Sequence, residues 1–252
     1  MFPAPLAPSL RSFAMGDRLP PIRHSAFICY LAATLVLAVG VVVAFSRYPG
    51  GYDWVYTVVS RLASPTRNPD GGHWVTGSLL LAVPLFWPAT YHLARAHTAG
   101  GRRPRLPITA LRVGLAGAAL LAVEGLLGLD FSRPFRKGHE ALAIVTFLGF
   151  YGGVLGLFFH RARYGTGSVM GGLVVILPLV AVGLSQTALY FDQRDLGWVN
   201  TEWRELGVPF WLSFAFWQWL AVLFLGLGLG YLVLKSGPTS EASSEALPAR
   251  RS

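Results

Sequence analysis

Six long stretches of predominantly apolar residues divide the chain, and short polar or charged segments separate them. They are residues 26–45, 75–94, 108–129, 141–159, 169–190 and 208–234. Each is about as long as a helix that crosses a hydrocarbon core of ~30 Å at ~1.5 Å per residue. The pattern therefore predicts an all-α fold, a polytopic integral membrane six-helix bundle. Pro84, Pro88 and Pro178 predict kinks in the second and fifth spans.

The composition supports a chain whose main solvent is lipid. Of its 252 residues, 53% are hydrophobic and 13% are charged, and the mean hydropathy is +0.50. This apolar content excludes a disordered chain, and the single cysteine, Cys29, excludes a disulfide scaffold. We expect a flexible cytoplasmic N-terminus over residues 1–25, one membrane domain over 26–234 and a flexible cytoplasmic tail over 235–252.

The first apolar stretch has an alternative interpretation as a cleaved signal peptide. Arg11, Arg18 and Arg23 precede it, and Ala44-Phe45-Ser46 resembles a small-residue cleavage site. The stretch is longer than the ~7–15 apolar residues of a signal peptide. A retained span is the working hypothesis, and cleavage stays open.

Charge is distributed unevenly between the two sets of loops. The termini and the loops on their side carry twelve Lys and Arg against three acids, whereas the opposite loops carry eight against eight. An excess of Lys and Arg in short loops marks the cytoplasmic side. We therefore expect both termini in the cytoplasm and a location in the cell inner (plasma) membrane. The net charge of +9 then needs no nucleic acid as a partner.

The first outer loop, residues 46–74, is too long for a simple connection. Tyr52, Val55, Val59 and Leu62 recur at helical spacing and predict a short interfacial helix that Asp53 caps. Tryptophan favours the headgroup level, and five tryptophans lie in or beside the outer loops. They are Trp54, Trp74, Trp198, Trp203 and Trp211.

Two charged residues, Arg112 and Glu124, lie inside the third span. Arg112 is close enough to the inner end to extend its side chain to the headgroups. Glu124 lies ~9 Å along the helix from Asp130 at the outer boundary. It therefore needs a partner, a water-filled cavity or a bound proton. A proton or substrate site and a structural hydrogen bond between helices both remain open.

The connection between the third and fourth spans, residues 128–140, combines carboxylates, cations and a histidine. Asp130, Arg133, Arg136 and His139 converge there, a composition suited to a phosphate or an anionic headgroup. The spacing from Arg133 to His139 matches one element of the lipid-phosphatase signature, but the other elements are absent. The histidines at the two ends of the second span and of the fourth lie ~28–32 Å apart along their helices, at the water boundary and not inside the bundle, so they do not suit haem. A hydrolytic zinc site would need three protein ligands on one side of the membrane. We expect no metal and no cofactor.

Short motifs in the outer segments resemble an uncharacterised bacterial family of six-span membrane proteins, distantly similar to the DRAM and Frag families. Val59-Ser60-Arg61-Leu62-Ala63-Ser64 followed by Asn68-Pro69 carries the first motif, and Gly128-Leu129-Asp130 with His139 carries the second. Arg61 stands where that family usually has an acid. The resemblance implies a six-helix bundle with an outer polar cluster and a connection to lipid metabolism or membrane trafficking.

The leading hypothesis is a membrane protein that binds or processes a lipid or small amphiphile at an outer-facing polar site. The predicted ligand-binding residues are Asp53, Ser60, Arg61, Glu124, Arg133 and Arg136, with Asp130 and His139 as candidate catalytic residues. A small proton-coupled transporter that uses Glu124 and a non-catalytic scaffold are the alternatives, and whether the protein is an enzyme stays open. Membrane lipids are the expected partners.

Glycine pairs at GxxxG spacing also suggest close helix contacts. They are Gly152 with Gly156 and Gly226 with Gly230. Packing within one chain is the favoured interpretation of these pairs, and a homo-oligomer through the same helices stays open.

Overall fold

The computed structural model describes residues 21–98, 102–129, 138–164, 167–193 and 207–235, and its regular elements are helical. The elements are α1 (Pro21–Ser46), α2 (Val59–Ala63), α3 (Gly72–Ala96), α4 (Arg105–Leu127), α5 (Gly138–Arg163), α6 (Met170–Gln193), the 3₁₀ turn η1 (Phe210–Leu212) and α7 (Phe214–Leu234). The all-α prediction is confirmed. Helix α1 begins at Pro21 and so reaches into the N-terminal segment that was predicted to be flexible; the predicted tail from residue 236 lies outside the described residues.

Five of the helices are long and apolar enough to cross a membrane, namely α1, α4, α5, α6 and α7. The chain is therefore a membrane protein by length and composition. Helix α3 corresponds to the remaining predicted span and has 25 residues, but it is not among these five. Inside this helix lie two prolines, Pro84 and Pro88, and its sequence also includes histidines and hydroxyl side chains among the apolar residues.

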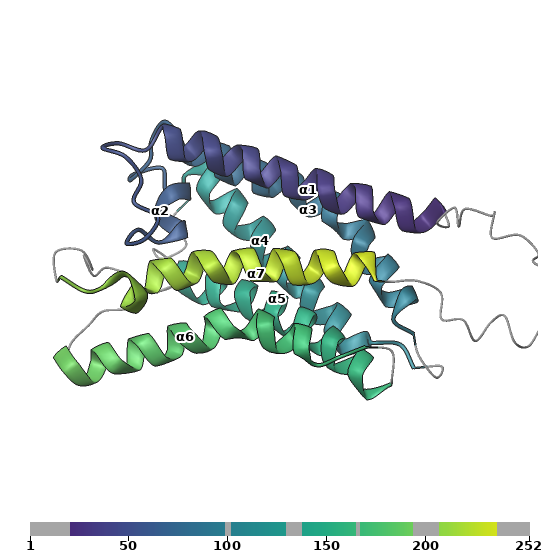
Figure 1. Ribbon diagram of the computed structural model, residues 1–252. Coiled ribbons are helices and arrows are strands. Elements are labelled where there is room, and N and C mark those ends of the chain that lie inside the picture. Colours follow the sequence, from purple (N-terminus) through teal and green to yellow (C-terminus); the bar gives the residue numbers. More distant parts are fainter. Residues whose placement is uncertain (1–20, 99–101, 130–137, 165–166, 194–206, 236–252) are drawn as a thin grey trace, which may run out of the picture.

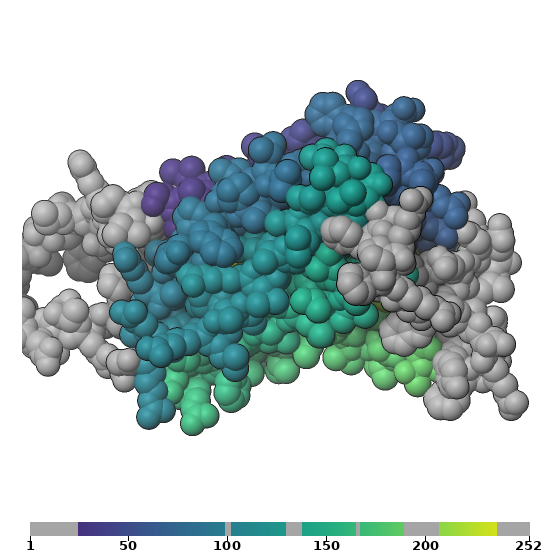
Figure 2. Space-filling model, turned by 180° about the vertical axis from the view of Figure 1, so that it is seen from behind, coloured from purple at the N-terminus to yellow at the C-terminus, as the bar shows by residue number. Residues whose placement is uncertain are grey.

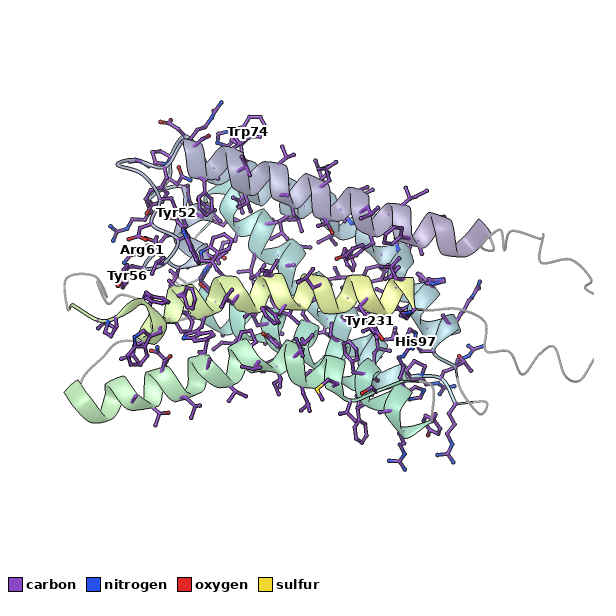
Figure 3. All side chains as sticks on the ribbon, in the orientation of Figure 1. Tyr52, Tyr56, Arg61, Trp74, His97 and Tyr231 are labelled. Atoms are coloured by element: carbon purple, nitrogen blue, oxygen red, sulfur yellow. The ribbon has the colours of Figure 1, made fainter. Side chains whose placement is uncertain are left out.

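The long helices pack as a bundle in which α3 lies between α1 and α4, α4 packs along α5, and α6 packs along α7 (Figure 1). Helix α1 also contacts α7, which closes the bundle. The start of α1 and the end of α7 lie at one end of the bundle, with His97 (Figure 3), and α2 lies at the other. We call these the His97 end and the α2 end.

Apolar side chains from α1 and from α3 to α7 fill the middle of the bundle. Leu93, Leu157 and Leu232 are completely buried there, and Tyr30 and Leu111 are nearly so. Tyr30 also donates its hydroxyl hydrogen to the Gly226 carbonyl at 2.7 Å, which ties α1 to α7. The many exposed aliphatic side chains on the outside of the same helices suit contact with lipid.

Glycine lets the backbones of α4 and α5 approach closely, but mainly at positions other than the predicted pairs. A Cβ atom added at Gly149 would lie 2.5 Å from the backbone nitrogen of Gly114. Of the predicted positions, a Cβ atom added at Gly156 would lie 2.8 Å from the Pro107 side chain. One added at Gly230 would lie 2.7 Å from the Tyr30 hydroxyl. A Cβ atom added at Gly152 would make only an ordinary van der Waals contact, and one added at Gly226 would have no neighbour within 4 Å. This glycine seam between α4 and α5 therefore lies inside the bundle.

Candidate functional site

The best-defined polar contact at the α2 end joins Glu124 on α4 to His139 on α5. Their Oε2 and Nδ1 atoms lie 2.8 Å apart. The Glu124 side chain is 7% exposed and the His139 side chain is 39% exposed. The buried carboxylate predicted from the sequence therefore has its partner, and the partner reaches the surface. With Nδ1 turned toward Glu124, the opposite ring nitrogen, Nε2, is left for another group.

The ends of the two helices explain why these side chains meet. Helix α4 ends at Leu127, and Gly128 adopts a left-handed φ of 62° that allows its N–H to return to the Glu124 carbonyl. Helix α5 begins at Gly138 and runs back along α4. Glu124, one turn before the end of α4, therefore lies beside His139 in the first turn of α5.

The predicted helix of the first outer loop is shorter than expected. Only Val59–Ala63 are helical, and Leu62 is completely buried. The prediction that Asp53 caps this helix is wrong: its Oδ1 accepts from the Val55 N–H at 3.2 Å in a local turn. The first residue of α2, Val59, instead donates its N–H to Gln218 Oε1 of α7 at 2.9 Å. A tertiary contact, rather than a local cap, starts the helix.

Two further hydrogen bonds fasten the loop before α2 to the segment that leads into α7. Ser213 donates its hydroxyl to the Val55 carbonyl at 2.6 Å. Tyr56 donates its hydroxyl to the Val208 carbonyl at 2.9 Å. The loop between α1 and α2 is therefore held against the segment that leads into α7 and not only against its neighbours in sequence.

Tyr52 lies at the centre of this loop and is shown with Tyr56 and Arg61 in Figure 3. Its hydroxyl donates to the Thr57 carbonyl at 2.8 Å and accepts from Trp219 Nε1 at 3.3 Å. Burial raises the pKa of the Tyr52 phenol above its usual value, while the charge of Arg61 opposes and that of Asp53 adds to this rise. Two predicted site residues, Asp53 and Arg61, thus act on one half-buried phenol.

Asn68 is a residue at this end whose importance the sequence did not reveal. It is completely buried, and its Nδ2 donates to the carbonyls of Ala44 at 3.2 Å and Leu62 at 2.9 Å. These carbonyls belong to the last turns of α1 and α2, where helical acceptors have no partner in their own helix. The only signal in the sequence was an Asn-Pro pair, which indicates a turn but not its partners.

The predicted site is thus assembled in part. Glu124 lies against His139, and Arg61 and Asp53 lie near Tyr52. Ser60 is half-buried on α2, and the last residue of α2, Ala63, lies close to Gly125 of α4. Asp130, Arg133 and Arg136 lie outside the described residues. Among the described residues, no group of three or more His, Cys, Asp or Glu side chains is placed to hold a metal ion.

A second polar cluster, at the His97 end, joins the ends of three helices. His97 is 5% exposed; its Nδ1 lies 3.1 Å from the Leu93 carbonyl, and its Nε2 accepts from Arg161 Nη1 at 3.2 Å. His160 Nε2 lies 3.0 Å from the His97 carbonyl, and Arg161 donates to the Lys235 carbonyl at 3.3 Å. Burial, helped by the charge of Arg161, lowers the pKa of His97 to about 4. The sequence placed His97 in a loop, so nothing marked it as buried.

Comparison with protein-family models, with curated proteins and with solved structures found no match to this chain. A carboxylate that orients a half-exposed imidazole is an arrangement that can accept a proton from a hydroxyl or donate a hydrogen bond to an anionic oxygen.

Proposed function

We propose that the protein spans the inner (plasma) membrane six times, with both termini in the cytoplasm, and binds or processes a lipid or small amphiphile at the α2 end, on the outer side. Within this proposal α3 is the remaining span and α2 is an interfacial helix. The resemblance to the uncharacterised six-span family belongs to the same proposal. The Glu124–His139 pair is the observation that carries the function.

The surroundings of α3 support its role as a span. It packs between α1 and α4, two helices that are themselves long and apolar enough to cross a membrane. Its buried hydroxyls on Thr76, Ser78 and Thr90 donate to backbone carbonyls three or four residues earlier. Because these hydroxyls are buried and hydrogen-bonded within the helix, they add little to the cost of placing α3 in lipid.

The distribution of charge supports the orientation. In the described segments, the His97 end carries Arg and Lys without any Asp or Glu, whereas the α2 end carries both signs. Arginine and lysine accumulate on the cytoplasmic side. Trp54, Trp74 and Trp211 are between 40% and 54% exposed at the α2 end, as expected for side chains at the level of the headgroups.

The chemistry of the site supports a ligand with a hydroxylated or anionic head. Glu124 fixes the ring of His139 through Nδ1, which leaves Nε2 for a hydroxyl or phosphate oxygen of the ligand. Arg61 supplies a cation on the neighbouring element. The apolar tail of an amphiphile would lie along the exposed aliphatic surface of the helices.

A binding measurement with short-chain lipids tests this function. Dihexanoyl phosphatidylglycerol is titrated into the purified full-length protein, and binding is followed by tryptophan fluorescence. We expect H139Q and R61Q each to weaken binding by about tenfold, the loss of one charge-assisted contact. The control is H73Q, which removes an exposed histidine at the same end and should leave the affinity unchanged. Equal affinities of all four proteins would overturn the proposal.

The same pair also supports the second candidate, proton-coupled transport. A buried Glu124 joined to a half-exposed His139 forms a two-group path from the surface to the bundle interior. Reconstituted vesicles with an imposed pH gradient test it, because proton flux should disappear in E124Q and persist in H73Q. A scaffold remains the third candidate; the α4–α5 glycine seam does not require one, since its contacts lie within this chain.

A further inference from the structure

Arg112 is held in place on the surface where α3 and α4 pack together. Its Nε donates to Thr90 Oγ1 at 3.3 Å. Thr90 is 1% exposed, and its own hydroxyl hydrogen goes to the Trp87 carbonyl at 2.9 Å. The hydroxyl oxygen is therefore left to accept from Arg112, and a buried residue fixes the root of the guanidinium.

Two aromatic rings on successive turns of α3 hold the same guanidinium. Its Cζ lies 4.6 Å from the ring centre of Tyr91 and 5.7 Å from that of Trp87. Both distances are within the range of cation–π attraction. Tyr91 is 52% exposed and Trp87 is 37% exposed, so the clamp opens to the outside of the bundle. Arg112 is thus a fixed cation, whereas the sequence alone indicated a side chain that extends freely to the headgroups.

The terminal nitrogens of Arg112 remain available for a ligand. A guanidinium has five N–H donors, and only the one on Nε is used by Thr90. Within the part of the chain that the structure describes, Nη1 and Nη2 have no protein acceptor. Four donors in a fixed plane match the paired oxygens of a phosphate group.

Further cations continue this surface toward the His97 end. Arg95 follows Tyr91 by four residues on α3, and Arg105 precedes Arg112 by seven on α4, so each lies on the same side of its helix. Both are exposed. No Asp or Glu of the described segments lies at this end, so the charge of these segments is positive there. Figure 2 shows the face of the molecule on which α3 and α4 are exposed.

The depth of Arg112 selects a lipid over a water-soluble ligand. It lies ~10 Å along α4 from Arg105, and helical side chains tilt toward the N-terminus of their helix, here toward the headgroups. The guanidinium therefore lies near the phosphate level, with apolar surface on the other side. Exposed Val113 and Leu120 continue along α4 toward the middle of the bundle.

We propose that Arg112, clamped by Trp87, Thr90 and Tyr91, binds the phosphodiester of an anionic phospholipid in the leaflet at the His97 end, with an acyl chain along α4. Arg95 and Arg105 add long-range attraction. The site lies at the opposite end of the bundle from Glu124 and His139 and does not depend on the function proposed there.

Native mass spectrometry of the full-length protein in detergent tests the site, with phosphatidylglycerol and phosphatidylcholine supplied in equal amounts. We expect the wild type to retain phosphatidylglycerol preferentially and R112Q to lose this preference by about tenfold. R163Q, which removes an exposed arginine of the same end on α5, should stay within about twofold, as a diffuse surface charge would. Loss of the preference to the same extent in both variants, or in neither, would overturn the proposal.

Two further arms keep the test decisive. T90V keeps the charge and the volume but removes the acceptor for Nε, so it should weaken the preference by about threefold even if R112Q fails to fold. Millimolar glycerol phosphate should not displace the retained lipid. Displacement would assign the site to a soluble phosphate ester and would contradict the lipid.

Discussion

His139 on α5 presents its Nδ1 to the carboxylate of Glu124 on α4 at 2.8 Å, and the carboxylate is buried while the imidazole is partly exposed. Burying a carboxylate is unfavourable unless a partner satisfies it. The pair is therefore a structural tie between two helices as well as the centre of the proposed site.

Removal of either partner should destabilise the protein through the other. H139A leaves the Glu124 carboxylate buried without its imidazole, at a cost of about 1–3 kcal/mol, while E124Q keeps an acceptor and should cost less. A double-mutant cycle on the midpoint of thermal unfolding in detergent measures the coupling. Additive effects of the two substitutions would show that the contact contributes nothing to stability.

His97 should make stability depend on pH at the opposite end. Its pKa is lowered to about 4, so the folded state favours the neutral imidazole of His97 over the charged one. The resulting stability is complete above the unfolded-state pKa of about 6.5 and is lost as pH falls toward 4, by up to about 3 kcal/mol. Thermal unfolding between pH 7 and pH 4 should show this loss.

The matched variants for this prediction are H97Q and H73Q. Glutamine at position 97 keeps an acceptor for Arg161 but does not titrate, so the slope of stability against pH should flatten. H73Q changes an exposed histidine and should keep the wild-type slope. The same slope in H97Q as in the wild type would assign the pH dependence to other groups.

Asn68 should be among the most sensitive positions of the segment between α1 and α3. N68A removes two hydrogen bonds to the carbonyls of Ala44 and Leu62 and leaves a buried space, which should cost about 2–4 kcal/mol. Hydrogen exchange of the α2 amides should become faster. D70A, an exposed change in the same turn, should be neutral, and similar exchange rates in the two variants would count against this role.

Two glycines on α5 should respond very differently to one added methyl group. A Cβ at Gly149 would lie 2.7 Å from the Gly114 Cα, and backbone cannot move aside without separating α4 from α5. G149A should therefore cost about 1–3 kcal/mol. At Gly152 the nearest atom is the Ala110 Cβ at 3.7 Å, an ordinary contact, so G152A should be neutral. Unfolding midpoints of the two variants in detergent decide the point.

The proposed orientation can be tested by cysteine labelling. In a background with Cys29→Ser, single cysteines replace Arg67 at the α2 end or Arg163 at the His97 end, both exposed. A membrane-impermeant maleimide added to intact spheroplasts should label position 67 and should label position 163 only after lysis. The reverse pattern would place the α2 end in the cytoplasm.

The helices followed from the sequence because apolar runs of membrane length leave the backbone few alternatives. In lipid, backbone groups must be satisfied within the segment, so composition and length predict a spanning helix directly. The sequence pattern predicted least well where tertiary contacts, rather than local spacing, decide whether a short segment is helical. The spacing from Tyr52 to Leu62 predicted one helix, yet the structure has only Val59–Ala63, started by Gln218 from a distant helix.

The sequence predicted a site residue only where burial of its side chain costs free energy. Glu124 was identifiable because a carboxylate within an apolar run demands a partner. That His139 is this partner depends on how α4 and α5 are paired, and the roles of Asn68 and His97 depend on which carbonyls the bundle brings to them. Such contacts join residues far apart in the chain, and no local pattern encodes them.

The sequence by itself determined that this is a helical membrane protein, where its long helices lie and that its net positive charge lies in the loops on one side. The tertiary structure decided the rest. It placed His139 against Glu124, buried His97 in contact with Arg161 and brought Arg112 to the rings of Trp87 and Tyr91. The physical reason is that solvent preference acts on each segment separately, whereas hydrogen bonds, ion pairs and ring contacts require two particular atoms to meet.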